Sequence, residues 1–141
     1  MPTLNETFSV PNADHAWSVI SDLNTLVPCV PGARVSSADS SQSVKAEITV
    51  KMGAIGMKFS GPVTIVSTDA GSRTVKIKAN TREAGGQSNA TGDITISLNG
   101  GTGTVNAIAN VSGKAASMGE GQVVGVLTRL VQGFSTNLGA A

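Results

Sequence analysis

The 141-residue sequence contains one cysteine and one histidine, and it does not open with a basic segment followed by an apolar run. A single cysteine excludes an intramolecular disulfide, and the missing opening is the one that secretory signal peptides have. We therefore expect a cytoplasmic protein. The 10 basic and 9 acidic residues are scattered and leave a net charge of +1. Because binding to a phosphate backbone needs clustered positive charge, we expect no nucleic-acid partner.

Aromatic residues are also scarce, with three Phe, one Trp and no Tyr beside 17 glycines. Aromatic side chains bury the largest areas in protein cores. A domain without them either packs thinly around Val, Ile, Leu and Met or encloses a hollow. The composition leaves both outcomes open, and the second suits a protein that holds an apolar ligand. The length predicts a single domain over residues 1–141.

The N-terminal part predicts one strand followed by short helices. Residues 7–10 are expected to form the strand, and Asn12 or Asp14 can cap the helix that follows. A second helical turn is predicted at residues 23–27. The run 28–32, Pro-Cys-Val-Pro-Gly, is predicted to be a rigid, non-helical connector, because proline fixes the backbone and lacks an amide donor.

From residue 33 to residue 112 the hydrophobic pattern has a period of two, which is typical of half-buried strands. In residues 44–52, for example, apolar side chains alternate with Lys45, Glu47 and Lys51. The alternation recurs in residues 57–65, 75–79, 90–98 and 105–111, and turn-forming clusters lie at residues 39–42, 53–56, 69–72, 85–86 and 99–103. Such short connections join antiparallel neighbours. The pattern therefore predicts a meander of about six strands with one apolar face.

After Gly113 the period becomes 3.6. The apolar stripe consists of Val123, Leu127, Leu130, Val131, Phe134 and Leu138. It predicts a long amphipathic helix from about residue 118 to residue 138, which covers the apolar face of the curved sheet. Gly119, Gly121 and Gly125 lack the parallel strand context of a dinucleotide fingerprint. They either leave room for a bulky ligand, or form a glycine-rich hinge or allow close packing of the helix against the sheet.

The order of these elements resembles the α+β helix-grip fold of the START/Bet v 1-like (SRPBCC) superfamily, in which a curved antiparallel meander wraps around a long C-terminal helix and two short helices follow the first strand. The opening Phe8-Ser9-Val10-Pro11, then Trp17 and Asp22, and then Cys29-Val30-Pro31-Gly32-Ala33 resembles the start of the CoxG family of carbon monoxide dehydrogenase subunits. The Cys-x-Pro-Gly-Ala element is its most specific part. Residues 53–61 and 113–125 are also similar to the family's pattern.

This resemblance implies a small protein that accompanies an aerobic molybdenum hydroxylase oxidising carbon monoxide, and that links this enzyme to the respiratory membrane. The partners implied are the carbon monoxide dehydrogenase subunits and the inner face of the cell membrane, which the protein would contact peripherally. A respiratory quinone, menaquinone or ubiquinone, is the apolar ligand that such a role favours. It would be bound non-covalently, and no covalent cofactor is expected.

The side chains that could carry catalysis show no recognisable constellation. His15 has no Ser or Cys partner and is predicted to lie on the surface, Cys29 is predicted to be structural, and Trp17 to anchor the core. The acidic residues considered fall at helix starts, turns or the polar faces of strands: Asp14, Asp22, Glu47, Asp69, Glu83, Asp93 and Glu120. Because no general acid is placed in an apolar pocket, we expect no enzyme. Because Cys29 has no second cysteine at the spacing of a metal site, we expect no metal site.

We therefore predict an apolar cavity between the sheet and the long helix, open near residues 27–28 and 119–121. The residues predicted to line it are Val27, Val50, Met52, Met57, Phe59, Ile77, Ala107, Met118, Val123, Val126, Leu127 and Leu130. Two other functions stay open. One is a structural adaptor for membrane recruitment or assembly of the dehydrogenase, with a filled interior. The other, less favoured, is an enzyme similar to the polyketide cyclases.

Overall fold

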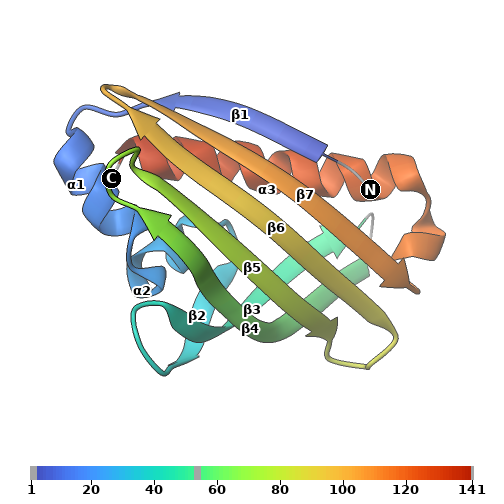
Figure 1. Cartoon of the computed structure of the whole chain (residues 1–141). Coiled ribbons are helices and arrows are strands. Elements are labelled where there is room, and N and C mark those ends of the chain that lie inside the picture. Colours follow the sequence, from blue (N-terminus) through green and yellow to red (C-terminus); the bar gives the residue numbers. More distant parts are fainter. Residues whose placement is uncertain (1–2, 53–54, 141) are drawn as a thin grey trace.

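The computed structural model of the protein describes residues 3–52 and 55–140, without the side chains of residues 52, 55 and 118 (Figure 1). The strands are β1 Thr3–Ser9, β2 Ala33–Ala38, β3 Ser43–Met52, β4 Ile55–Asp69, β5 Thr74–Glu83, β6 Ser88–Asn99 and β7 Thr102–Gly113. The α-helices are α1 Ala13–Ile20, α2 Leu23–Leu26 and α3 Glu120–Ala140. Two 3₁₀ turns, η1 Val27–Cys29 and η2 Ala116–Met118, lead into β2 and α3.

All seven strands form one antiparallel sheet in the order β1-β7-β6-β5-β4-β3-β2. The six strands after the short helices form the predicted meander, and β1 pairs with the last of them. The sheet curves around α3, while α1 and α2 lie at the end of the sheet where α3 terminates (Figure 1). This is the predicted helix-grip arrangement.

The first strand is longer than predicted, and the first helix is capped as predicted. Residues 3–6 extend the strand because they pair with β7, from Thr3 opposite Ile108 onwards. The two strands lie about 100 residues apart in the sequence, so no local pattern marks their pairing. At the start of α1, the side chain of Asn12 accepts the backbone N–H of His15 at 3.1 Å. Asn12, and not Asp14, is therefore the cap.

The prediction of a non-helical connector at residues 28–32 is wrong for its first part. Val27–Cys29 forms a 3₁₀ turn with Pro28 in its first turn. Proline is tolerated there because the first turn of a helix donates no amide hydrogen bond within the helix. Gly32 then takes a φ of 81°, and a Cβ at that residue would lie 2.6 Å from the carbonyl oxygen of Thr49. The chain can enter β2 closely beside β3 because residue 32 is glycine.

The core has two parts that lie at different ends of the sheet. The larger part joins α1, α2 and the end of α3 to the sheet, and includes the fully buried Ile20, Leu23, Ile96 and Leu138. Trp17 is half-buried and packs against it, as predicted. The smaller part joins the start of α3 to β4 and contains Met57, Phe59, Ala115, Val123 and Val126.

The helix α3 approaches the rest of the chain most closely in its second half. A Cβ at Gly133 would lie 2.5 Å from Cγ of Pro31, and one at Gly139 would lie 2.8 Å from the carbonyl oxygen of Ser9. At Gly121 a Cβ would meet no atom within 4 Å, and at Gly125 only the Arg129 guanidinium at 4.0 Å. Close packing against the sheet, one interpretation of Gly121 and Gly125, is therefore wrong.

Two glycines of β4 provide a matched test of how closely β4 packs against β5. A Cβ at Gly61 would lie 2.1 Å from the carbonyl oxygen of Asn80, whereas one at Gly56 would meet nothing within 4 Å. We expect Gly61→Ala to lower the free energy of unfolding by about 2 kcal/mol or more, because backbone must move. Gly56→Ala should change it by less than about 1 kcal/mol. Urea denaturation measures both, and equal effects would contradict the close strand contact at Gly61.

Candidate functional site

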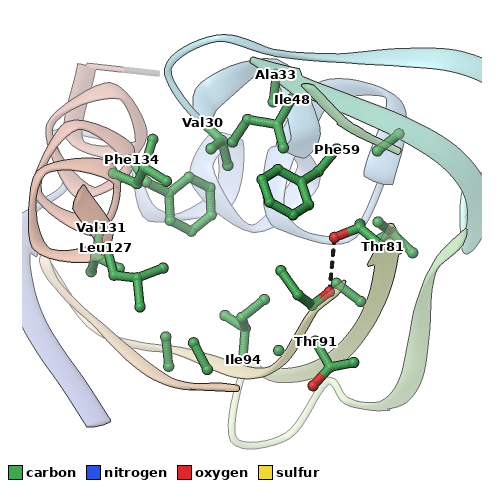
Figure 2. Close-up of a pocket in the computed structure, with 18 of the residues that line it drawn as sticks. Val30, Ala33, Ile48, Phe59, Thr81, Thr91, Ile94, Leu127, Val131 and Phe134 are labelled. Atoms are coloured by element: carbon green, nitrogen blue, oxygen red, sulfur yellow. Dashed lines mark hydrogen bonds between the residues drawn. The ribbon is translucent and has the colours of Figure 1, made fainter. Parts of the chain in front are cut away.

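An apolar cavity of about 270 Å³ lies between the concave face of the sheet and α3. Figure 2 shows side chains from both sides pointing into it, with Leu127, Val131 and Phe134 on the helix and Phe59, Thr81 and Ile94 on the strands. The alternation of each strand places every second side chain on this face. The cavity thus follows from the two hydrophobic periodicities, with α2 and η1 contributing Leu23, Leu26 and Val27.

Nine of the twelve predicted site residues line this cavity. They are Val27, Val50, Phe59, Ile77, Ala107, Val123, Val126, Leu127 and Leu130. Met57 does not line it: the side chain is 3% exposed and belongs to the smaller core cluster, with Ala115, Val123 and Val126 from the start of α3 and the segment before it. The prediction for Met57 is therefore wrong, because these residues cover the inner face where β4 begins. The side chains of Met52 and Met118 lie outside the described residues.

Sequence reasoning missed several lining residues, and two signals could have found most of them. The strand alternation that selected Val50 and Ile77 also marks other inner-face residues, and the stripe of the last helix continues beyond Leu130. The missed residues with these signals are Ala46, Ile48, Val63, Ala79, Ala90, Ile94, Val105, Val111, Val131 and Phe134. No local pattern marks Leu4, Leu26 or Val30, which reach the cavity through tertiary packing.

The cavity wall has almost no polar side chain. Thr81 is the exception at the centre of the sheet, and its hydroxyl donates to the carbonyl oxygen of Ala90 at 2.8 Å (Figure 2). The side chain of Thr91 points away from the cavity (Figure 2). No charged residue of the described chain lines the wall. Such a site can hold an apolar group by shape and by the hydrophobic effect.

Glu83 departs from the prediction that no acidic residue lies on an apolar strand face. It is the last residue of β5 and shares the inner face with Val75, Ile77 and Thr81. It also stands opposite Phe59 of β4 in the register. Its Oε1 atom is buried and has no hydrogen-bond partner among the described residues. The prediction is wrong because the inward alternation of β5 continues through its last residue.

A second hollow lies between β1 and α3 and has a different character. It is lined by Glu6, Thr7, Phe8, Ser9, Gln132, Ser135, Thr136 and Gly139. Most of these side chains are polar. The two spaces differ enough in polarity for an apolar ligand to prefer the cavity inside the sheet.

The other chemistry-bearing side chains do not converge on the cavity. His15 is exposed at the start of α1, as predicted. Cys29 is half-buried, and its Sγ atom lies 3.5 Å from the carbonyl oxygen of Thr25. Burial raises the pKa of this thiol, which makes it a poorer nucleophile at neutral pH. Within residues 3–52 and 55–140, His, Cys, Asp and Glu form no group with the arrangement of a metal site.

None of the helices in the described part of the chain combines the length and the hydropathy needed to span a membrane. Peripheral contact with the membrane stays a prediction.

Solved structures with the same architecture come from bacteria and a plant. A conserved protein from Geobacillus kaustophilus has a TM-score of 0.75 at 20% identity, over 98% of this chain and 91% of its own. The ZhuI aromatase/cyclase from Streptomyces sp. R1128 has a TM-score of 0.61 at 11% identity, over 99% and 90%. Ginseng major latex-like protein 151 from Panax ginseng has a TM-score of 0.55 at 8% identity, over 96% and 95%. At these identities the likeness establishes the fold alone, which is the arrangement of a curved antiparallel sheet around a long helix.

A family model also matches the chain. It describes the carbon monoxide dehydrogenase subunit CoxG, and it covers residues 7–141. A search among curated proteins finds no match.

The cavity leads to a test at Leu127, which lines it from α3. We expect Leu127→Trp to occupy the space and to weaken the binding of an apolar fluorescent probe, N-phenyl-1-naphthylamine, at least tenfold, or about 1.4 kcal/mol. The thermal midpoint should change by less than about 5 °C, because the cavity accepts the larger ring. Arg129→Trp, on the exposed side of the same helix, should leave binding unchanged. If the wild type does not bind the probe and Leu127→Trp is destabilised, the interior is a filled core and the prediction is contradicted.

Proposed function

The chain belongs to the CoxG family of carbon monoxide dehydrogenase subunits, and from this membership we propose that it is a non-catalytic binding protein for a respiratory quinone. The family and the helix-grip fold both support a role in binding hydrophobic molecules. The finer assignment is that the ligand is menaquinone or ubiquinone, and that the protein connects a carbon monoxide dehydrogenase to the electron-transport chain of the membrane.

The observation that supports this proposal is the apolar cavity of about 270 Å³, with no charged side chain among its described lining residues. The volume is near the lower end of ligand pockets, about 300–1,000 Å³. It would enclose a quinone ring and the first part of a prenyl tail, and the rest of the tail would extend beyond it. An apolar tail of this kind needs shelter from water wherever it leaves the bilayer.

The energetics of such binding are favourable. Burial of about 400 Å² of apolar ligand surface contributes about 10 kcal/mol. Loss of translational and rotational freedom costs at least about 4 kcal/mol. The remainder, at most about 6 kcal/mol, corresponds to a dissociation constant of some tens of micromolar or above. That affinity is strong enough for transport and weak enough for the ligand to exchange with a membrane.

The proposed role in electron transfer follows from the dehydrogenase partner. Oxidation of carbon monoxide releases two electrons in a soluble enzyme, whereas long-tailed quinones reside in the bilayer. A carrier that meets the dehydrogenase and makes peripheral contact with the inner face of the membrane would connect the two. The residues that hold the quinone are proposed to be those lining the cavity, Phe59, Leu127 and Leu130 among them. No catalytic step is assigned to this chain.

The direct test is organic extraction of the protein purified from a bacterial host that makes both menaquinone and ubiquinone, followed by chromatography and mass spectrometry. We expect about one quinone per chain in the wild type and less than a tenth of that in Leu127→Trp, because the indole fills the cavity. An empty wild type, repeated after incubation with quinone-loaded vesicles, would contradict the carrier function. The structural adaptor for membrane recruitment or assembly would then be the better explanation.

A further inference from the structure

The carboxylate of Glu83, of which the Oε1 atom is buried, has no role in holding the fold that the described residues reveal. It ends β5 on the inner face of the sheet, where its strand neighbour Thr81 and its register partner Phe59 both line the cavity. The residue is half-buried, so it lies at the rim between the apolar interior and the turn that follows. Oε2 points to that turn, since a Cβ at Gly85 would lie 3.8 Å from it. Oε1 is buried without a hydrogen-bond partner.

The polar groups around Glu83 are already engaged elsewhere. Thr81 donates its hydroxyl to the carbonyl oxygen of Ala90. Arg82 pairs with Asn89 in the register, so Ser88 is the next residue of β6 toward Glu83. Its hydroxyl oxygen accepts the backbone N–H of Ala115 at 2.8 Å. Burial of a carboxylate oxygen without a partner is costly, and a hydrogen bond from a bound ligand would offset that cost.

The nearby cations are also directed away from Glu83. Lys58 lies 3.3 Å from Glu47 on the outer face of the sheet. Nε of Arg82 donates to the side chain of Asn89, also on the outer face, at 3.2 Å. Neither guanidinium nor ammonium group compensates the buried oxygen. Glu83 is not itself a lining residue, but its carboxylate stands beside the lining residues Thr81 and Phe59. It therefore places one strong hydrogen-bond acceptor next to an otherwise apolar wall.

We propose that Glu83 accepts a hydrogen bond from a ring hydroxyl of the ligand, so that the site prefers the reduced quinol to the oxidised quinone. The proposal rests on the quinone-binding function proposed above. An ionised carboxylate accepts hydrogen bonds and donates none. A quinol has hydroxyl donors, whereas a quinone offers only carbonyl acceptors, which a carboxylate repels. The preference suits a protein that carries the reduced form away from the dehydrogenase.

The test compares three probes on the full chain under anaerobic conditions: decylubiquinol, decylubiquinone and dodecylbenzene, which has a similar tail and no polar head. We expect the wild type to bind the quinol at least about tenfold more tightly than the quinone, as one hydrogen bond to a charged group predicts. Glu83→Gln should lose this preference, because an amide can donate to the quinone carbonyl as well as accept. Glu83→Leu should bind both forms equally.

Glu47→Gln is the matched control, since Glu47 lies on the outer face, where hydrogen bonds from Lys58 and Arg34 lower its pKa. It should keep the preference for the quinol. Thermal unfolding identifies a variant that has lost its fold, and Glu83→Gln, which keeps the size of the side chain, then decides the comparison. Equal binding of quinol and quinone by the wild type, or an unchanged preference in Glu83→Gln, would overturn the role of Glu83 while leaving the binding function intact. Failure to bind any probe, dodecylbenzene included, would overturn the binding function itself.

Discussion

The concave face of the sheet is mostly apolar, and α3 is the element that covers it. The helix is held close to the chain in its second half, where Gly133 meets Pro31 and Gly139 meets the backbone of Ser9. Small side chains, Ala79, Ala90 and Ala107, form part of the cavity wall on the side of the sheet. These do not reach across the space that the helix leaves, and interiors without bulky side chains either collapse or remain hollow. The cavity therefore results from where the helix is anchored and from the scarcity of aromatic residues.

This arrangement separates the parts of the molecule that maintain the fold from those that can hold a ligand. The larger core cluster closes the end of the sheet next to α1 and α2, with Leu23 and Ile96 fully buried. Toward the other end the wall consists of residues such as Leu127 and Leu130, which are only partly buried and pack against the smaller cluster. A ligand can therefore enter and leave beside these partly buried residues while the larger cluster stays intact. Apolar burial then provides the affinity, and a single acceptor, Glu83, can provide the selectivity.

Most of the fold was predictable from the sequence, because both of its periodicities are local. Alternation in residues 44–52 and the stripe from Val123 to Leu138 fix which faces meet, and these faces line the cavity. The features that could not be predicted depend on contacts between residues distant in the sequence. They are the pairing of residues 3–6 with β7, the burial of Met57 in the smaller core cluster, and the contribution of Leu26 to the cavity wall. The inward position of Glu83 continues the period of β5, yet its charge suggested a polar face. The neighbouring strands decide whether a charged residue at the end of a strand faces the interior. A single sequence does not identify those neighbours.

The central claim is that an apolar ligand enters the space between the sheet and α3. Methyl NMR of protein labelled at Ile, Leu and Val, titrated with decylubiquinone, tests it most directly. The account predicts saturable shifts at Ile77, Leu127 and Leu130, which line the cavity. Val66, whose side chain is 58% exposed, should not change. Shifts confined to surface methyl groups, or unchanged interior methyl groups while the ligand binds, would contradict the account.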